Sequence, residues 1–317
     1  MSLLRIHLFG SVRVAHEGRS SVGRLTHAVQ GLLAYLVLHR RRLHARETLS
    51  GLFWGDHSEP RARSCLSTTL WRLRQVLEPD GIVRGTYLIA GSSAAVGFNF
   101  DSEHWIDAEV FELEVTRALA TGARRELVND KNLGEALRLY TGDILDAHFA
   151  DWALAERERL RLLYLSGLTR LMHHQADRGF LDEACASARC VLEVDPLREE
   201  VHRELMRLQL RRGDRAAAIR QYRTCREVLA RELGVPPMEE TRALHARIVA
   251  DSPAPLHTPG NAPVSSALES VLEPLHLAAE ALEQVRAHLQ LAVRFASRGG
   301  HSGSPSVSES PPNPRAE

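Results

Sequence analysis

The sequence lacks the spacings by which cysteine and histidine usually hold metal ions. Its four cysteines, at positions 65, 185, 190 and 225, include no CxxC pair. The sixteen histidines are scattered, and His173 and His174 are adjacent, whereas a helical zinc pair needs residues four positions apart. We therefore expect free cysteines in a reducing compartment, with no metal and no cofactor.

Signatures of enzymes and of membrane proteins are also missing. There is no GxxxxGKS or GxxxxGKT phosphate-binding loop and no GxSxG nucleophile elbow. The acidic pairs Glu199-Glu200 and Glu239-Glu240 stand among arginines, where solvated ion pairs are the usual role. No apolar run approaches the roughly eighteen residues of a membrane helix, and no signal peptide is recognisable. These absences predict a cytoplasmic protein that is not an enzyme and does not bind a membrane.

Lysine is almost absent, Lys131 being the only one, so nearly all the positive charge is arginine. The formal net charge is zero, but the charges are unevenly distributed. Residues 1–90 contain thirteen Arg against six Asp or Glu, an excess of seven that the remainder balances. A basic head on an acidic body is typical of a protein whose N-terminal part binds nucleic acid.

The segment from Pro60 to Leu77 predicts a helix with two different faces. One face carries an apolar stripe at helical spacing, made of Ala62, Leu66, Leu70, Leu73 and Leu77. The other face carries Arg, Ser, Thr and Trp, with no acidic residue between positions 61 and 75. Arginine forms paired hydrogen bonds with guanine, and Ser and Thr are short adaptable contacts. This face either contacts the phosphates and base edges of DNA or is a solvated basic surface, and the neighbouring segments favour DNA binding.

The flanking segments predict a winged helix. Alternating apolar residues at 4–8 and 12–14 indicate a small antiparallel sheet, and helical periodicity follows over about 24–38 and 45–54. After the helix at 60–77, two β-like runs at 82–90 and 94–100 predict a hairpin. A sheet, three helices and a hairpin in this order are typical of a winged helix, whose third helix enters the major groove.

Several segments resemble the OmpR-type DNA-binding domain found in the SARP family of antibiotic regulatory proteins. They are LRIHLFGSVRV, LLAYLVLHRRRLHARETLSGLFWGD, RARSCLSTTLWRLRQVL and VRGTYLIAGSSAAVGFN. WIDAEVFE at 105–112 is similar to the family's join between this domain and its partner, and the resemblance extends over about residues 3–250. It implies a transcription regulator that binds double-stranded promoter DNA.

The resemblance also implies which residues make the contacts. The groove-facing positions would be Ser64, Ser67, Thr68 and Arg72, while Trp71 and Arg74 would lie against the DNA backbone. Arg84 and Thr86 match the family's wing pattern and would hold phosphate or the minor groove. Two positions depart from the family, since Trp71 replaces a small polar residue and Tyr87 replaces the glycine that usually follows in the wing.

Two further groups of residues are candidate contacts. The loop between the second and third helices touches RNA polymerase in the family, and here it consists of Asp56, His57, Ser58 and Glu59. The basic run after the first helix either contacts phosphates or is simply solvated, and it consists of Arg40, Arg41, Arg42 and Arg46.

The second half of the chain predicts helical repeats. Gly179 and Gly213 lie 34 residues apart, as do Ala184 and Ala218, which is the period of tetratricopeptide (TPR) helix pairs. The predicted pairs are 168–176 with 181–194 and 199–211 with 215–231, after a less regular unit at 132–163. This half resembles the bacterial transcriptional activation domain that follows the winged helix in SARP-type regulators. The alternative is a generic helical bundle.

A Pro-rich linker precedes one more predicted helix. Leucines at 268, 275, 282 and 289 recur every seventh residue over 266–297, with small or branched residues three places after each. This heptad pattern predicts either self-association through a coiled coil or a helix that folds back on its own repeat domain. The last residues, 298–317, are rich in Ser, Gly and Pro and predict disorder.

These observations predict a mainly α protein of several parts. The expected domains are an OmpR-type winged helix with small antiparallel sheets at 1–100, a TPR-like activation domain at 101–250, a linker at 251–265, a heptad helix at 266–297 and a disordered tail at 298–317. The predicted function is sequence-specific regulation of transcription by an activator that binds direct repeats as a homodimer or higher oligomer and contacts RNA polymerase. The alternative is a TPR-like adaptor for protein partners with a degenerate winged helix.

Overall fold

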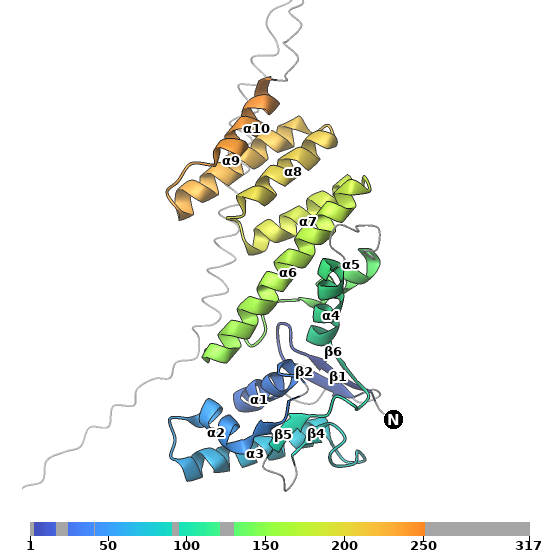
Figure 1. Ribbon diagram of the computed structural model, residues 1–317, viewed down its shortest axis with the longest axis vertical. Helices are drawn as coiled ribbons and strands as arrows, with labels where there is room; N and C mark the ends of the chain where they lie inside the picture. The colour runs from blue at the N-terminus through green and yellow to red at the C-terminus, as the bar shows by residue number, and fades with distance from the viewer. Residues whose placement is uncertain (1–2, 17–24, 41, 91–94, 121–129, 251–317) are drawn as a thin grey trace, which may run out of the picture. The chain divides into compact units, whose positions relative to one another are not determined.

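The computed structural model describes residues 3–16, 25–40, 42–90, 95–120 and 130–250 (Figure 1). Within these ranges, an N-terminal winged helix is followed by a stack of helices, and the predicted fold class is confirmed. The linker, the heptad helix predicted at 266–297 and the tail lie outside the described residues. Within the described ranges, no helix is both long and apolar enough to cross a membrane.

The first sheet has one more strand than predicted. β1 (Leu4–His7) pairs antiparallel with β2 (Arg13–His16), as expected from the alternation. On its other edge β1 pairs in parallel with β6 (His104–Ile106), about a hundred residues later, so the order is β2-β1-β6. The predicted antiparallel pair is confirmed, and the parallel strand β6 adds to it. The sequence analysis missed β6 because a pairing between distant segments leaves no local pattern.

Three helices follow the first sheet. They are α1 (His27–Leu38), α2 (Arg46–Trp54) and α3 (Glu59–Leu77). α3 packs against α1 and α2, and its predicted apolar stripe is buried in full, from Ala62 to Leu77. Pro60 lies in the first turn of α3, where its missing N–H needs no partner within the helix.

The second sheet forms the base of the wing. Its order is β3 (His44–Ala45), β5 (Ala95–Phe98) and β4 (Leu88–Ile89), all antiparallel. The strand predicted over 82–90 is only two residues long, because the backbone before it bonds to a side chain instead of another strand. One carboxylate oxygen of Glu78 accepts the N–H groups of Gly85, Tyr87 and Leu88 at 2.9–3.0 Å.

The remaining described residues form helices that pack in chain order (Figure 1). They are α4 (Asp107–Ala120), α5 (Asp130–Leu139), α6 (Asp151–Asp177), α7 (Leu181–Val194), α8 (Glu199–Arg211), α9 (Arg215–Glu232) and α10 (Glu239–Ala250). Gly179 and Gly213 occupy the turns after α6 and α8 with positive φ angles of 83° and 78°, which glycine adopts without strain. The two predicted helix pairs are confirmed from α7 onwards.

α6 differs from its prediction because it begins at Asp151, well before position 168. The single helix joins the end of the predicted irregular unit to the first repeat, since no proline interrupts it. Gly167 lies in its middle, where a Cβ would come within 2.9 Å of Leu137 and 3.0 Å of Val115. This glycine therefore marks close packing against α4 and α5 rather than a break in the helix.

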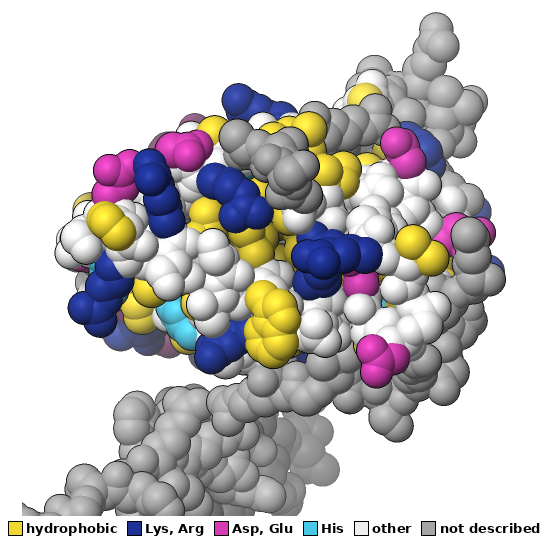
Figure 2. Space-filling model, turned by 90° about the horizontal axis from the view of Figure 1, so that it is seen from below, with side chains coloured by type: hydrophobic (Ala, Val, Ile, Leu, Met, Phe, Trp, Pro, Cys, Tyr) yellow, Lys and Arg dark blue, Asp and Glu magenta, His cyan; other side chains and the backbone are white. Residues whose placement is uncertain are grey.

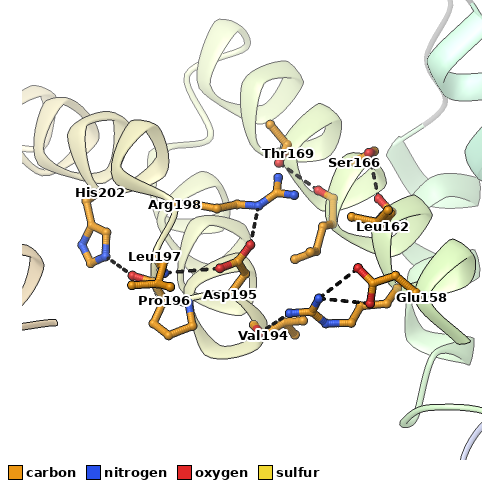
Figure 3. Close-up of polar contacts among 12 residues, drawn as sticks. Glu158, Leu162, Ser166, Thr169, Val194, Asp195, Pro196, Leu197, Arg198 and His202 are labelled. Atoms are coloured by element: carbon orange, nitrogen blue, oxygen red, sulfur yellow. Dashed lines mark hydrogen bonds and ion pairs between the residues drawn. The ribbon is translucent and has the colours of Figure 1, made fainter. Parts of the chain in front are cut away.

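Polar contacts fix the turn between α7 and α8 against α6 (Figure 3). Asp195 accepts hydrogen bonds from the side chain of Arg198 at 3.0 Å and from the N–H of Leu197 at 3.3 Å. His202 contacts the carbonyl oxygen of Pro196 at 3.0 Å, and Arg161 on α6 donates to the carbonyl oxygen of Val194. The turn is thus held at both ends by side chains of the neighbouring helices.

A shared core joins the winged helix to the first repeat helices. Phe9, which follows β1, packs edge-on against Phe111 of α4 at 5.2 Å and lies 4.9 Å from Tyr140. Buried Asp107, at the start of α4, accepts the N–H groups of Leu8 and Phe9. The same apolar cluster extends from β1 to α8, so within the described residues these elements stabilise one another.

Candidate nucleic-acid interface

The polar face of α3 is exposed, as the sequence predicted. Ser64, Ser67, Thr68, Trp71 and Arg72 are all exposed, and Trp71 reaches 62%. Figure 2 views the end of the molecule that carries the winged helix, where dark-blue arginine side chains lie apart from one another between neutral polar and apolar groups. Such a surface offers both charges for phosphates and uncharged groups for base edges.

Arg74 is the clearest departure from the predicted contacts. Its side chain is 11% exposed, and Nη1 lies 3.0 Å from Oε2 of Glu78, whose side chain is 1% exposed. Nη2 donates to the carbonyl oxygens of Ala90 at 2.9 Å and Leu88 at 3.4 Å. These bonds hold the Arg74 guanidinium between the end of α3 and the wing, whereas the family resemblance assigns it to the DNA backbone.

Glu78 is a residue that the sequence analysis missed. Its carboxylate binds Arg74 with one oxygen and, with the other, the backbone N–H groups of Gly85, Tyr87 and Leu88 at the start of β4 and just before it. A buried carboxylate needs this number of donors to compensate for the water that it loses. The sequence offered one signal for this role, because Glu78 is the first acidic residue after a long run without acids. Glu78 thus positions the wing relative to α3.

The two residues assigned to the wing lie before its hairpin. Arg84 is exposed in the turn that precedes β4, and Thr86 uses its hydroxyl to donate to the carbonyl oxygen of Val83 at 2.7 Å. Residues 91–94, between β4 and β5, lie outside the described residues. Arg84 shares a recess with Arg46 of α2, Arg74 of α3 and the edge of β4. The structure thus brings together three arginines that the sequence analysis placed in separate groups.

The basic run after α1 divides into residues with different roles. Arg40 forms an ion pair with Glu112 of α4 at 2.8 Å and lies 4.0 Å from Glu109. The side chain thus joins the winged helix to α4, a role that neither of the two interpretations of the basic run included. Arg42 is exposed, while Arg41 lies outside the described residues.

The loop between α2 and α3 is open to solvent. Its four predicted contact residues are all exposed: Asp56, His57, Ser58 and Glu59. Glu59 forms an i,i+4 ion pair with Arg63, one turn further along α3. The loop is therefore accessible to a partner, with Glu59 partly neutralised by its neighbour.

Burial shifts the pKa of two groups that hold the winged helix to the helices that follow it. Burial raises the pKa of the Asp107 carboxyl, while the N–H groups of Leu8, Phe9 and Ala108 act in the opposite direction. Burial lowers the pKa of His148, whose ring stacks on that of His27 at 3.6 Å. Within the described part of the chain, no cluster of His, Cys, Asp and Glu has the composition of a metal site.

The described residues thus combine a winged helix, whose third helix exposes a face without acidic residues between positions 61 and 75, with a stack of TPR-like helices. Residues 106–249 match the family described as the bacterial transcriptional activator domain. That match covers the described helices from α4 to α10.

Curated relatives are similar over most of the chain. The regulatory protein AfsR of Streptomyces coelicolor is 28% identical over 261 residues, which cover 79% of this chain and 25% of AfsR. The transcriptional regulatory proteins EmbR and MoaR1 of Mycobacterium tuberculosis are each 26% identical, covering 78% and 71% of this chain and 63% and 72% of the relatives. The chain thus spans about a quarter of the length of AfsR.

A solved structure shows the same fold. It is M. tuberculosis EmbR in complex with a low-affinity phosphopeptide, with a TM-score of 0.64, 23% identity, and coverage of 80% of this chain and 67% of EmbR. Taken together, the match to the activator domain and the relatives show that this chain is similar to transcriptional regulators of the SARP family.

Proposed function

We propose that this protein is a sequence-specific DNA-binding activator of transcription. α3 enters the major groove, and the wing contacts the flanking backbone, as in other winged helices. The observation that carries the proposal is the exposed face of α3, which presents arginine and hydroxyl groups and no carboxylate between positions 61 and 75. Relatives that are transcription regulators support the same conclusion.

Base reading is assigned to residues in the middle of α3. Arg72 donates in pairs to guanine O6 and N7, a contact that discriminates against other bases by about 1–3 kcal/mol. Ser64, Ser67 and Thr68 make shorter contacts from the same face, and Trp71 stacks against sugar or packs beside the wing.

Phosphate binding is assigned to exposed or partly exposed cations around α3. Arg46 and Arg84 line one recess between α2 and the wing, where a single phosphate would meet both. Arg42 is exposed near the first strand of the wing sheet and is a third candidate. These contacts fix the position of α3 in the groove without reading sequence.

The repeat domain and the α2–α3 loop complete the proposed mechanism. Two copies bind neighbouring direct repeats, so that each raises the effective concentration of the other. Asp56, His57, Ser58 and Glu59 contact RNA polymerase from the loop. We retain the division into a winged helix at 1–100 and an activation domain at 101–250 as part of this proposal.

The test is binding of mapped promoter fragments and of unrelated duplexes, measured by fluorescence anisotropy over a range of salt. We expect Arg72→Ala to weaken specific binding by about 1–3 kcal/mol and non-specific binding much less. Arg84→Ala should weaken both about equally and lower the salt slope by roughly one. Arg117→Ala, which removes an exposed charge on α4, is the matched control.

Two results would contradict the proposal. If Arg72→Ala weakened specific and non-specific binding equally, Arg72 would be a phosphate contact and the base assignment wrong. If affinity for DNA barely changed between low and moderate salt, phosphate neutralisation would be excluded. The adaptor function would then be favoured.

A further inference from the structure

An apolar pocket lies where the winged helix meets the start of α6. It encloses about 180 Å³ and is lined from α1 by Gly31, from α2 by Phe53 and Trp54, and from the α6 end by Phe149 and Trp152. For comparison, an engineered apolar cavity of about 150 Å³ binds benzene, so this pocket has room for one apolar or aromatic side chain.

The pocket walls are held in place by aromatic contacts. Phe53 packs against Trp152 at 5.7 Å, and the stacked rings of His27 and His148 lie at its edge. A Cβ on Gly31 would approach His148 Nε2 to 3.1 Å and Phe53 to 3.3 Å, so glycine permits the close approach of these rings. The hollow is thus built by side chains from both domains.

Exposed apolar side chains extend the pocket to the surface. Phe149 is 77% exposed, and Leu52, which also lines the pocket, is 41% exposed. Large apolar groups around a hollow are unusual on a free surface and mark a site where another molecule binds. Their exposure indicates that the partner covers an area wider than the hollow itself.

Acidic side chains adjoin this apolar surface. Asp56 follows the lining residue Trp54 by two positions, Asp146 precedes His148 by two, and Asp151 separates Ala150 from Trp152. All three are exposed, and within the described part of the chain none of them forms an ion pair with an arginine, while Asp146 interacts electrostatically with His148. The nearby cation Arg157 points inward and donates to the carbonyl oxygens of Leu145 and His148.

We propose that this surface, defined by Leu52, Phe149 and the three aspartates, binds a basic amphipathic helix of a partner protein. One apolar side chain of that helix enters the pocket, and its arginines or lysines meet the aspartates. Charge complementarity selects this partner over an acidic one. The proposal extends the proposed activator role, because the surface continues from the α2–α3 loop, but the two can fail separately.

The test compares two synthetic helical peptides with the same leucine pattern, one carrying arginine and the other glutamate at every remaining position. Binding to the full chain is measured by fluorescence anisotropy. We expect the arginine peptide to bind and the glutamate peptide not to bind. Phe149→Ser should weaken binding about tenfold, and Asp146→Asn with Asp151→Asn should weaken it about threefold and reduce its salt dependence.

Controls separate this surface from others. Phe180→Ser removes an apolar side chain that is 45% exposed at the turn after α6, and it should leave peptide binding unchanged. Equal binding of both peptides, or equal loss in the Phe149 and Phe180 variants, would overturn the proposal, as would no binding of the arginine peptide. The parent and all variants should bind promoter DNA equally. If the parent itself did not bind promoter DNA, the proposed function would fail while the peptide measurements would still decide this proposal.

Discussion

The buried pair of Arg74 and Glu78 gives the sharpest test of how the DNA-binding face is built. From the sequence, Arg74 is a contact to the DNA backbone, whereas the structure places it in an ion pair beneath the wing. The variant Arg74→Ala distinguishes a DNA contact from a structural ion pair, because the two roles predict different losses. Loss of a phosphate contact would lower DNA affinity alone, while loss of the buried pair would lower stability first.

The expected magnitude follows from what each group would lose. In Arg74→Ala the buried Glu78 carboxylate loses its only charged partner among the described contacts, and two carbonyl oxygens at the wing lose a donor. Breaking a buried ion pair by removing one partner costs about 3–5 kcal/mol. Because a typical domain is stable by about 5–15 kcal/mol, this is a large fraction of the total.

The assay is urea denaturation followed by circular dichroism, together with hydrogen exchange of the Tyr87 and Leu88 amides that bond to Glu78. The matched control is Arg63→Ala, which breaks the exposed pair with Glu59 on the same helix and should cost less than about 1 kcal/mol. An Arg74→Ala variant as stable as the Arg63 variant, but with weakened DNA binding, would refute the structural assignment and restore the phosphate contact.

Two further predictions concern the repeat domain. His202 contacts Pro196 O and Gln221 through its two ring nitrogens, and burial lowers its pKa below 6.5. The unfolded state therefore binds the proton at a higher pH than the folded state, so the free energy of unfolding should fall as the pH drops below about 6.5. The fall should be less steep in His202→Asn. Equal dependence on pH in the two proteins, measured by urea titrations, would contradict this. Gly167→Ala should lower the free energy of unfolding by about 1–3 kcal/mol through overpacking. Gly134→Ala, in open space on α5, should raise it by about 0.5–1 kcal/mol. If thermal melts showed that both variants shift Tm in the same direction, the packing argument would be wrong.

The sequence predicted the elements whose signals are local. The apolar stripe from Ala62 to Leu77 specifies which face of α3 is buried, because helical periodicity alone determines it. The 34-residue spacing of Gly179 and Gly213 likewise predicted the turns of the repeats, and both glycines have the positive φ that such turns require. Because the buried face of α3 is known from the sequence, the side chains on its exposed face are known as well.

Long-range pairings were decided only in the tertiary structure. The parallel strand β6, the bonds from Asp107 to the end of β1 and the pairing of Arg40 with Glu112 join residues that are far apart in the chain. An arginine in a basic run has the same sequence signature whether it faces phosphate or a buried carboxylate. The sequence by itself therefore determined which helices form and which faces they bury, while the fold decided which charges remain free for DNA, because that depends on the partners that packing brings within hydrogen-bonding distance.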